Sequence, residues 1–96
     1  MATISKVCGI KISINARGEH PPPHFHFVYN NKRYRFKIKE LEFYEGSGYH
    51  NNPKDIPKKI RNKLVEWTKI HQNELLENWT RLVESKDEPF YIDELN

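Results

Sequence analysis

The sequence predicts an α+β domain in which a three- or four-stranded antiparallel sheet is followed by one long helix or two consecutive helices packed on one face. Apolar and polar residues alternate in parts of the first 44 positions, and this period of two is typical of half-buried strands. From residue 56 to residue 82 apolar residues instead recur at steps of three and four, as on one side of a helix. We therefore expect a single domain, 1–96, with strands over about 3–44, a helical part over about 56–85 and an acidic C-terminal tail over 86–96.

The strand region divides at its turn residues. Residues 3–15 are predicted as a first strand, with Gly9 as a point at which it could be interrupted. Residues 24–29 and 32–39 are predicted as a hairpin, because the Asn30-Asn31 pair between them tolerates the positive φ of a tight turn. A short fourth strand is expected around residues 41–44. The irregular segment from Gly46 to Pro57 follows, and the sequence gives no role for it.

The helical part has a predicted start and a predicted weak point. Asp55 is expected to cap the N-terminus, with Pro57 in the first turn, where its missing N–H costs nothing. The chain is least helical around residues 71–73, and Asn73 could cap a second helix. One apolar stripe runs along the whole part and includes both tryptophans as core residues: Ile56, Ile60, Leu64, Trp67, His71, Leu75, Trp79 and Leu82. Residues 89–92 are expected to pack back onto the sheet.

Composition limits the classes of protein to which the chain can belong. Its 96 residues contain one cysteine, Cys8, which excludes an intrachain disulfide. No run reaches the roughly 18 apolar residues of a membrane span, and no signal-peptide run follows Met1, so a cytoplasmic protein without a membrane partner is expected. Residues 1–39 hold eight Lys or Arg against one acid, whereas residues 73–96 hold two against seven. The basic half predicts an acidic partner, either nucleic acid or protein, unless the two halves neutralise each other within the fold.

Three histidines are the candidates for catalysis or metal binding: His20, His24 and His26. Alternation places His24 and His26 on one face of a strand, about 7 Å apart at Cα, where two imidazoles can converge on one ion or anion. The rigid Pro21–Pro23 segment could return His20 to the same place. The sequence does not require a divalent metal, and whether the protein is an enzyme stays open. Candidates for a third ligand are His50, Glu66, His71 and Glu74. The structural alternative is that the histidines bond to loop carbonyls.

The predicted binding residues are the four cations on one face of the third strand: Arg33, Arg35, Lys37 and Lys39. Alternate positions on a strand are about 7 Å apart, close to the spacing of phosphates along a nucleic-acid strand. The alternative is a solvated face that resists aggregation. The sequence contains no phosphate-binding glycine loop and no nucleophile elbow.

The segment E-H-P-P-P-H-F-H, residues 19–26, resembles the D-H-x-P-P-H-F-H signature of a small prokaryotic family catalogued as domain of unknown function 4160. The helical residues Glu66-Trp67, His71, Glu74-Leu75 and Asn78-Trp79 are similar to its E-W-x3-H-x2-E-L-x2-N-W pattern. Glu19 replaces the usual Asp, and the stretch from Gly46 to Pro57 is longer than the family's connection.

Members of that family resemble, in size and gene pairing, the toxins of two-gene toxin–antitoxin modules, with an antitoxin from the family called domain of unknown function 2442. The resemblance implies a toxin that is neutralised by a small acidic antitoxin and has a possible nucleic-acid target. The alternatives are a non-toxic nucleic-acid-binding module, a metal- or His-dependent hydrolase such as a nuclease, and an adaptor.

Overall fold

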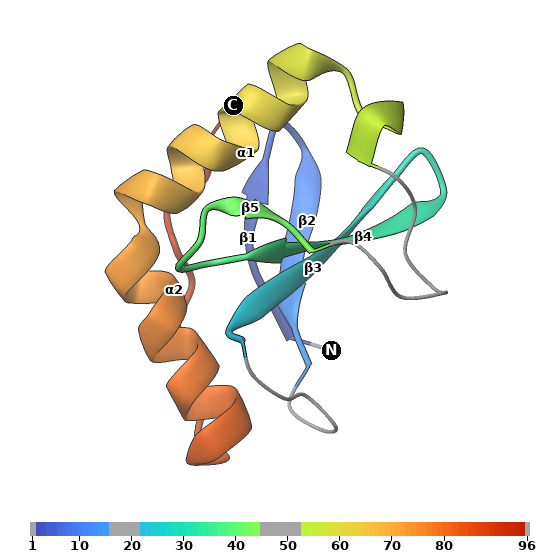
Figure 1. The fold of residues 1–96 in the computed structure, drawn as a ribbon. Helices are drawn as coiled ribbons and strands as arrows, with labels where there is room; N and C mark the ends of the chain where they lie inside the picture. The colour runs from blue at the N-terminus through green and yellow to red at the C-terminus, as the bar shows by residue number, and fades with distance from the viewer. Residues whose placement is uncertain (1, 16–21, 45–52, 96) are drawn as a thin grey trace.

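The structure, a computed structural model, describes residues 2–15, 22–44 and 53–95. Its antiparallel sheet has five strands in the order β1-β2-β3-β4-β5, so each strand pairs with its neighbour in the chain. The strands are β1 (Ala2–Val7), β2 (Ile10–Ile14), β3 (His24–Tyr29), β4 (Lys32–Lys37) and β5 (Glu42–Phe43). Helices α1 (Lys58–Ile70) and α2 (Gln72–Trp79) lie on one side of the sheet (Figure 1). The predicted α+β class is confirmed, although the sheet has more strands than we expected.

The additional strand comes from the segment that we predicted as a single first strand. β1 and β2 form a hairpin that turns at Cys8 and Gly9, whose φ angles are 50° and 79°. Positive φ at both central residues is the geometry of the favoured two-residue hairpin turns. The chain therefore reverses at the glycine where we expected only an interruption, and alternation continues on both sides because both segments bury the same face.

The hairpin of β3 and β4 forms as predicted. It turns at Asn30 and Asn31, whose φ angles are 52° and 64°, and its register runs from the pair His24–Lys37 to the pair Tyr29–Lys32. A backbone hydrogen bond from Ile38 N to Pro23 O, 3.0 Å long, extends the pairing beyond the strands. β5 lies where the short fourth strand was expected and pairs with the end of β4.

The helical stripe is buried as predicted, but both helix boundaries differ from the prediction. Asp55 is not a cap, because it ends the 3-10 turn η1 (Pro53–Asp55) and its carboxylate pairs with Lys32 Nζ at 3.3 Å. α1 begins after Pro57 without a side-chain cap, and α2 begins after His71 rather than at Asn73. A π-helical turn, η2 (Thr80–Glu84), continues α2. Within the described residues, no helix is both long and apolar enough to cross a membrane.

Aromatic side chains of β3 and β4 form the centre of the core between the sheet and the helices. The rings of Phe25 and Phe36 stack with centroids 5.3 Å apart, and Phe27 stacks on Tyr34 at 5.4 Å. Trp67 meets the Phe25 ring edge-to-face at 6.0 Å and is 1% exposed. The covered face of the sheet therefore consists of the residues that alternation assigned to it.

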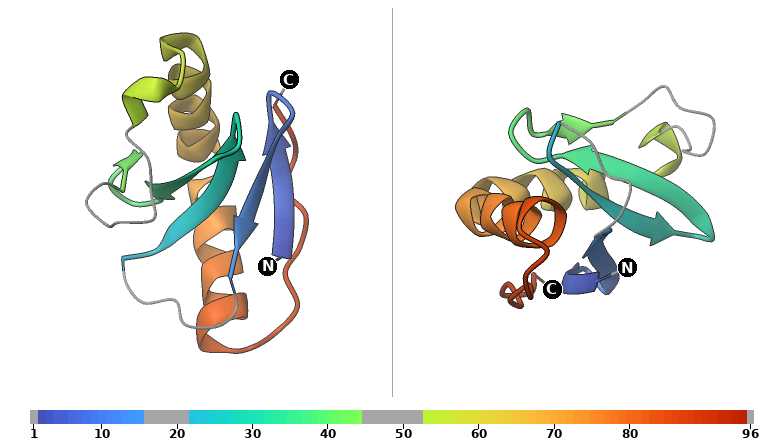
Figure 2. Two further views of the ribbon diagram at one scale, coloured as in Figure 1. Left: turned by 90° about the vertical axis from the view of Figure 1, so that its right-hand side faces the viewer. Right: turned by 90° about the horizontal axis from the view of Figure 1, so that it is seen from below.

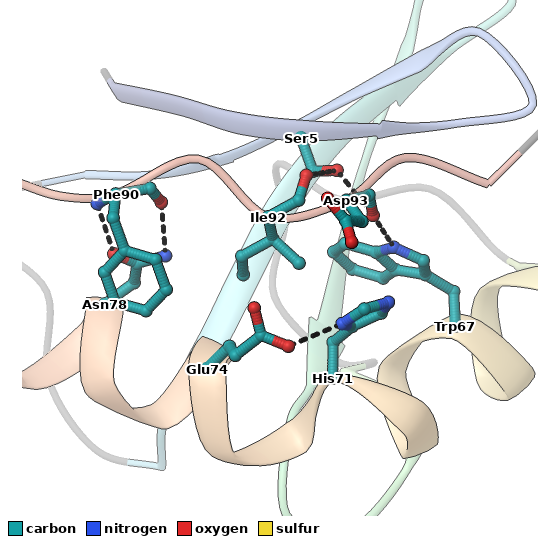
Figure 3. A network of polar contacts seen from close by, with 8 residues as sticks. All are labelled: Ser5, Trp67, His71, Glu74, Asn78, Phe90, Ile92 and Asp93. Carbon is teal, nitrogen blue, oxygen red and sulfur yellow. Dashed lines mark hydrogen bonds and ion pairs between the residues drawn. The ribbon is translucent and has the colours of Figure 1, made fainter.

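The C-terminal tail packs back onto the sheet, as expected, and it completes the core. Figure 2 shows it running beside β1. Ile92 N donates to Ile4 O at 2.8 Å, Leu95 N donates to Lys6 O at 3.1 Å, and the Ile92 side chain is fully buried. Two side chains of the helices hold the tail from the other side. Trp67 Nε1 donates to Asp93 O at 2.8 Å, and Asn78 bonds to both backbone groups of Phe90 at 2.9 Å (Figure 3).

Candidate functional site

The face of the sheet opposite the helices, here called the open face, carries the predicted site residues that the structure describes in its strands. The register places Ser13 of β2 opposite His26 of β3, and His26 opposite Arg35 of β4. Tyr44 follows β5, and its backbone N–H donates to Arg35 O at 3.0 Å. A row of polar and aromatic side chains therefore crosses the sheet at its middle.

Four residues form a cluster on this face, here called the open-face cluster: His24, His26, Arg35 and Tyr44. The rings of His24 and His26 have centroids 5.0 Å apart, and the His24 ring lies 5.3 Å from the Tyr44 ring. Arg35 Cζ lies 3.9 Å from the centroid of the Tyr44 ring, the geometry of a cation–π contact. The two histidines are neighbours, as predicted.

His24 lies on the same face of β3 as His26, as alternation predicts, but its side chain is buried there. It is 1% exposed, and its ring packs 5.2 Å from the ring of Trp79. Its Nδ1 lies 2.8 Å from Pro22 O, and because a carbonyl only accepts, Nδ1 is the donor. Alternation fixed the face correctly, but it could not show that Trp79 of α2 and Tyr44 cover this corner of the sheet. The contact with a loop carbonyl agrees with the structural alternative for this residue.

The structure differs from the predicted row of four cations at three of its positions. Arg35 is only 7% exposed. Lys37 Nζ pairs with Glu42 of β5 at 3.3 Å, so the face mixes charges where we expected only positive ones. Lys39 lies beyond the end of β4, in the turn that leads to β5, and it is exposed. Arg33 remains an exposed cation on the strand.

Arg35 is the unusual residue of the open-face cluster. Within the described part of the chain, neither Nε nor Nη2 of its buried guanidinium has a hydrogen-bond partner. The Tyr44 ring contacts Cζ of the guanidinium but accepts no hydrogen bond from Nε or Nη2. Sequence reasoning treated Arg35 as one of four equal cations and missed Tyr44. The signal available in the sequence was an aromatic residue, Tyr44, at the end of the short strand expected around residues 41–44.

The structure does not bring three metal-binding side chains together in residues 2–15, 22–44 and 53–95. His71 Nδ1 instead lies 2.7 Å from Glu74 Oε1, in the helical layer beside the tail (Figure 3). Glu66 is exposed on α1. His20 and His50 lie outside the described residues. The two imidazoles of His24 and His26 could therefore supply two ligands at most from the part described.

A hollow of about 860 Å³ lies beside the cluster, between β2 and β3. These strands pair only at Ile12–Phe27 and Ser13–His26 and then diverge, which opens the space. Basic, apolar and aromatic residues share its lining, including Lys11, His26, Val28, Arg33 and Tyr34. Val28 is 53% exposed there.

Tyr34 contributes a second buried polar atom beside this hollow. Its hydroxyl has no hydrogen-bond partner among the residues that the structure describes. Burial first, and then the carboxylate of Asp55, raises the pKa of the Tyr34 phenol above its ordinary value of 10.0. The phenol is therefore held in its neutral form.

Comparison with protein families gives one match. The family described as Domain of unknown function (DUF4160) matches residues 9–80, which is most of the chain. The chain belongs to the DUF4160 family. The matched range contains β2 to α2 and the whole open-face cluster, but neither β1 nor the tail that pairs with it. No curated protein and no solved structure matches the chain.

Proposed function

We propose that this DUF4160 protein is the toxin component of a two-gene toxin–antitoxin module, which binds nucleic acid through the open face and is neutralised by a small acidic antitoxin. The observation that carries the proposal is the distribution of charge over the fold. Glu42 is the only acidic residue in the five strands, whereas six cations lie in them: Lys6, Lys11, Lys32, Arg33, Arg35 and Lys37. The resemblance to toxins in size and gene pairing supplies the toxic role.

The charge distribution separates basic strands from an acidic C-terminal tail. Every other acid of the described residues lies in a turn, a helix or the tail: Glu40, Asp55, Glu66, Glu74, Glu77, Glu84, Asp87, Glu88, Asp93 and Glu94. A polyanion approaching this molecule is therefore attracted to the strands and also to α1, which carries five Lys or Arg against one acid, and it is repelled by the tail. An acidic antitoxin would compete for the same attraction, which would explain how one surface serves both the target and its inhibitor.

The proposal is tested by inducing the gene alone in a bacterial host and then together with its neighbouring reading frame. Growth arrest that the neighbour relieves is the expected result. The variant Lys11→Glu/Arg33→Glu reverses two exposed cations that line the hollow, and it should lose toxicity while its melting temperature stays near that of the parent. Lys58→Glu/Lys59→Glu is the matched control, because both lysines are exposed at the start of α1. Full toxicity of a folded Lys11→Glu/Arg33→Glu protein would remove the open face from the proposal.

The non-toxic nucleic-acid-binding module remains the second candidate, because the same face supports it. Binding to single-stranded RNA that weakens steeply with salt, without growth arrest, would favour it over the toxin.

A His-dependent hydrolase is the third candidate. The observation that favours it is the pair of adjacent imidazoles, one of which donates to a backbone carbonyl that fixes its ring, as catalytic and metal-bound histidines commonly do. Cleavage of RNA by purified protein, abolished in His26→Asn, would support it. Cleavage that also stops on chelation would indicate a metal ion.

A further inference from the structure

We propose that the guanidinium of Arg35 is the binding site for one phosphate group, held in the plane of the guanidinium by Nε and Nη2 with His26 beside it. The proposal deepens and rests on the proposed binding of nucleic acid, because it names the residue that would hold a phosphate of that ligand. A phosphate group is common to inorganic phosphate, nucleotides and polynucleotides, and the experiment separates these sources.

The two Arg35 donors without a partner indicate which kind of ligand would fit there. Nε and Nη2 project from the same edge of the planar guanidinium, and this edge pairs with two oxygens of one anion in the bidentate geometry that arginine favours. Both atoms are enclosed, and neither has a partner among the described residues. A buried charge without its hydrogen bonds is destabilising, and an oxyanion on this edge would remove the penalty.

The residues around Arg35 accept no hydrogen bond from Nε or Nη2, but they can make further contacts with a bound anion. The Tyr44 ring makes a cation–π contact with the guanidinium, 3.9 Å from Cζ to the ring centroid. Glu42, the nearest strand acid in sequence, bonds to Lys37 instead. His26 lies directly opposite Arg35, and Ser13 lies directly opposite His26, so a donor-rich row continues across the sheet.

Phosphate fits this environment better than a carboxylate does. A phosphate group carries more oxygens than the guanidinium edge uses, and the remaining ones can accept from His26 or Lys37. The hollow beside the cluster begins at His26 and continues past Val28 to Lys11 and Arg33. It offers apolar and aromatic surface for the nucleoside attached to that phosphate and cations for the next phosphates along the strand.

Binding requires a small rearrangement, because Nε and Nη2 are enclosed in the structure. His26 borders both Arg35 and the hollow and is only partly buried, so its side chain is the one that moves. The phosphate therefore approaches from the hollow.

The experiment measures the melting temperature and the ³¹P NMR line width of the purified protein with inorganic phosphate, uridine 5′-monophosphate and acetate. Phosphate and the nucleotide should both raise the melting temperature, the nucleotide at lower concentration because it also fills the hollow. Arg35→Met should abolish both responses. Arg35→Lys keeps the charge but loses the bidentate edge, and its affinity should fall roughly ten- to hundredfold, the equivalent of one charge-assisted hydrogen bond. Lys58→Met, at an exposed position at the start of α1, is the control that should retain phosphate binding.

Three outcomes would overturn the inference: a phosphate response that survives in Arg35→Met, equal binding by Arg35→Lys, or an acetate response as large as that of phosphate, which would indicate a carboxylate site. If Arg35→Met does not fold, Arg35→Lys alone decides. The inference and the proposed function fail separately. If phosphate binding depends on Arg35 but the protein is not toxic, the phosphate site is supported and the toxin proposal is not. If cells that express Arg35→Met are still arrested, the toxin proposal is supported and this site is not.

Discussion

The two faces of the sheet are built from the same strands, but they differ in whether their buried polar groups are hydrogen-bonded. On the covered side, Ser5, Thr68 and Asn78 are buried and each bonds to a backbone group of the tail or the helix. On the open side, Arg35 is buried to a similar degree, and one edge of its guanidinium has no partner in the part of the chain that the structure describes. Buried polar groups in stable proteins are nearly always bonded. The contrast assigns stability to the covered face, and it is the reason that our proposal places ligand binding on the open face.

Trp79 connects the two faces. It is 3% exposed on the apolar stripe of the helices, yet its ring also touches His24 of the open-face cluster. A change at this residue would disturb both faces, so the faces are better tested at residues that belong to one of them only.

The largest effect is expected on the covered face at Trp67. Trp67→Ala removes a buried indole, its contact with Phe25 and its hydrogen bond to Asp93 O. The free energy of unfolding should fall by about 3–5 kcal/mol, as for other buried aromatic residues, and urea denaturation measures it. Glu66→Ala, at the exposed neighbouring position, is the control and should change stability by less than about 0.5 kcal/mol. If Trp67→Ala unfolded at the urea concentration of the parent, the covered face would not be the source of stability.

A smaller effect is expected at Asn78, which joins α2 to the tail. Asn78→Ala leaves the N–H and C=O of Phe90 without their partner, at about 1–3 kcal/mol for each group that stays buried. Hydrogen exchange should show the loss locally, because the amides of Ile92 and Leu95, which bond to β1, should exchange faster than those of β3. Glu77→Ala, next to it and in an exposed ion pair with Arg81, should leave the tail protected. Unchanged exchange at Ile92 in the Asn78 variant would show that the tail does not depend on this contact.

The smallest effect is expected at Tyr34, whose buried hydroxyl is the exception on the covered face. Tyr34→Phe removes an unpartnered polar atom and should change stability by no more than about 1 kcal/mol, in the stabilising direction. The pH dependence is more informative. Because the pKa of the phenol is raised in the folded protein, the unfolded state releases its proton first, and the parent loses stability as the pH rises above 10.0.

The Tyr34→Phe variant should lack that part of the loss, and urea denaturation at about pH 8 and about pH 10.5 measures the difference. A parent and a Tyr34→Phe variant with identical losses above pH 10.0 would contradict the raised pKa.

The parts of the fold with a regular apolar pattern were predictable, because an element that buries one face needs apolar residues at the spacing of a strand or of a helix. The Asn30-Asn31 turn and the buried stripe from Ile56 to Leu82 are confirmed on these grounds. The reversal at Cys8 and Gly9 was missed because alternation is the same in a long strand and in a hairpin whose two strands bury one face. The start of α1 was misplaced because the carboxylate of Asp55 pairs with Lys32, a residue far away in the chain.

The sequence could assign the candidate site residues to faces of their strands, but it could not predict their burial or their contacts. Alternation placed His24 and His26 on one face of their strand and Arg35 among the cations of the next strand, and the register shows that these residues are neighbours. Their burial depends on Trp79 and Tyr44, which reach the site through the tertiary packing of α2 and the chain after β5. Contacts between segments far apart in the chain leave no local pattern, so a single sequence could not show that Arg35 is enclosed.

The pairing of the tail with β1 has a consequence for the order in which the protein folds. The hydrogen bond from Ser5 Oγ to Ile92 O joins residues 87 positions apart, so it closes a loop of almost the whole chain, and such contacts form late. During synthesis, β1 and its partner strands emerge long before the residues that cover the outer edge of β1. Until then that edge exposes backbone groups to any other extended chain, which is the usual route to aggregation. Pulse-labelled hydrogen exchange during refolding would detect this interval as protection of β3 and β4 before protection of Ile92 and Leu95.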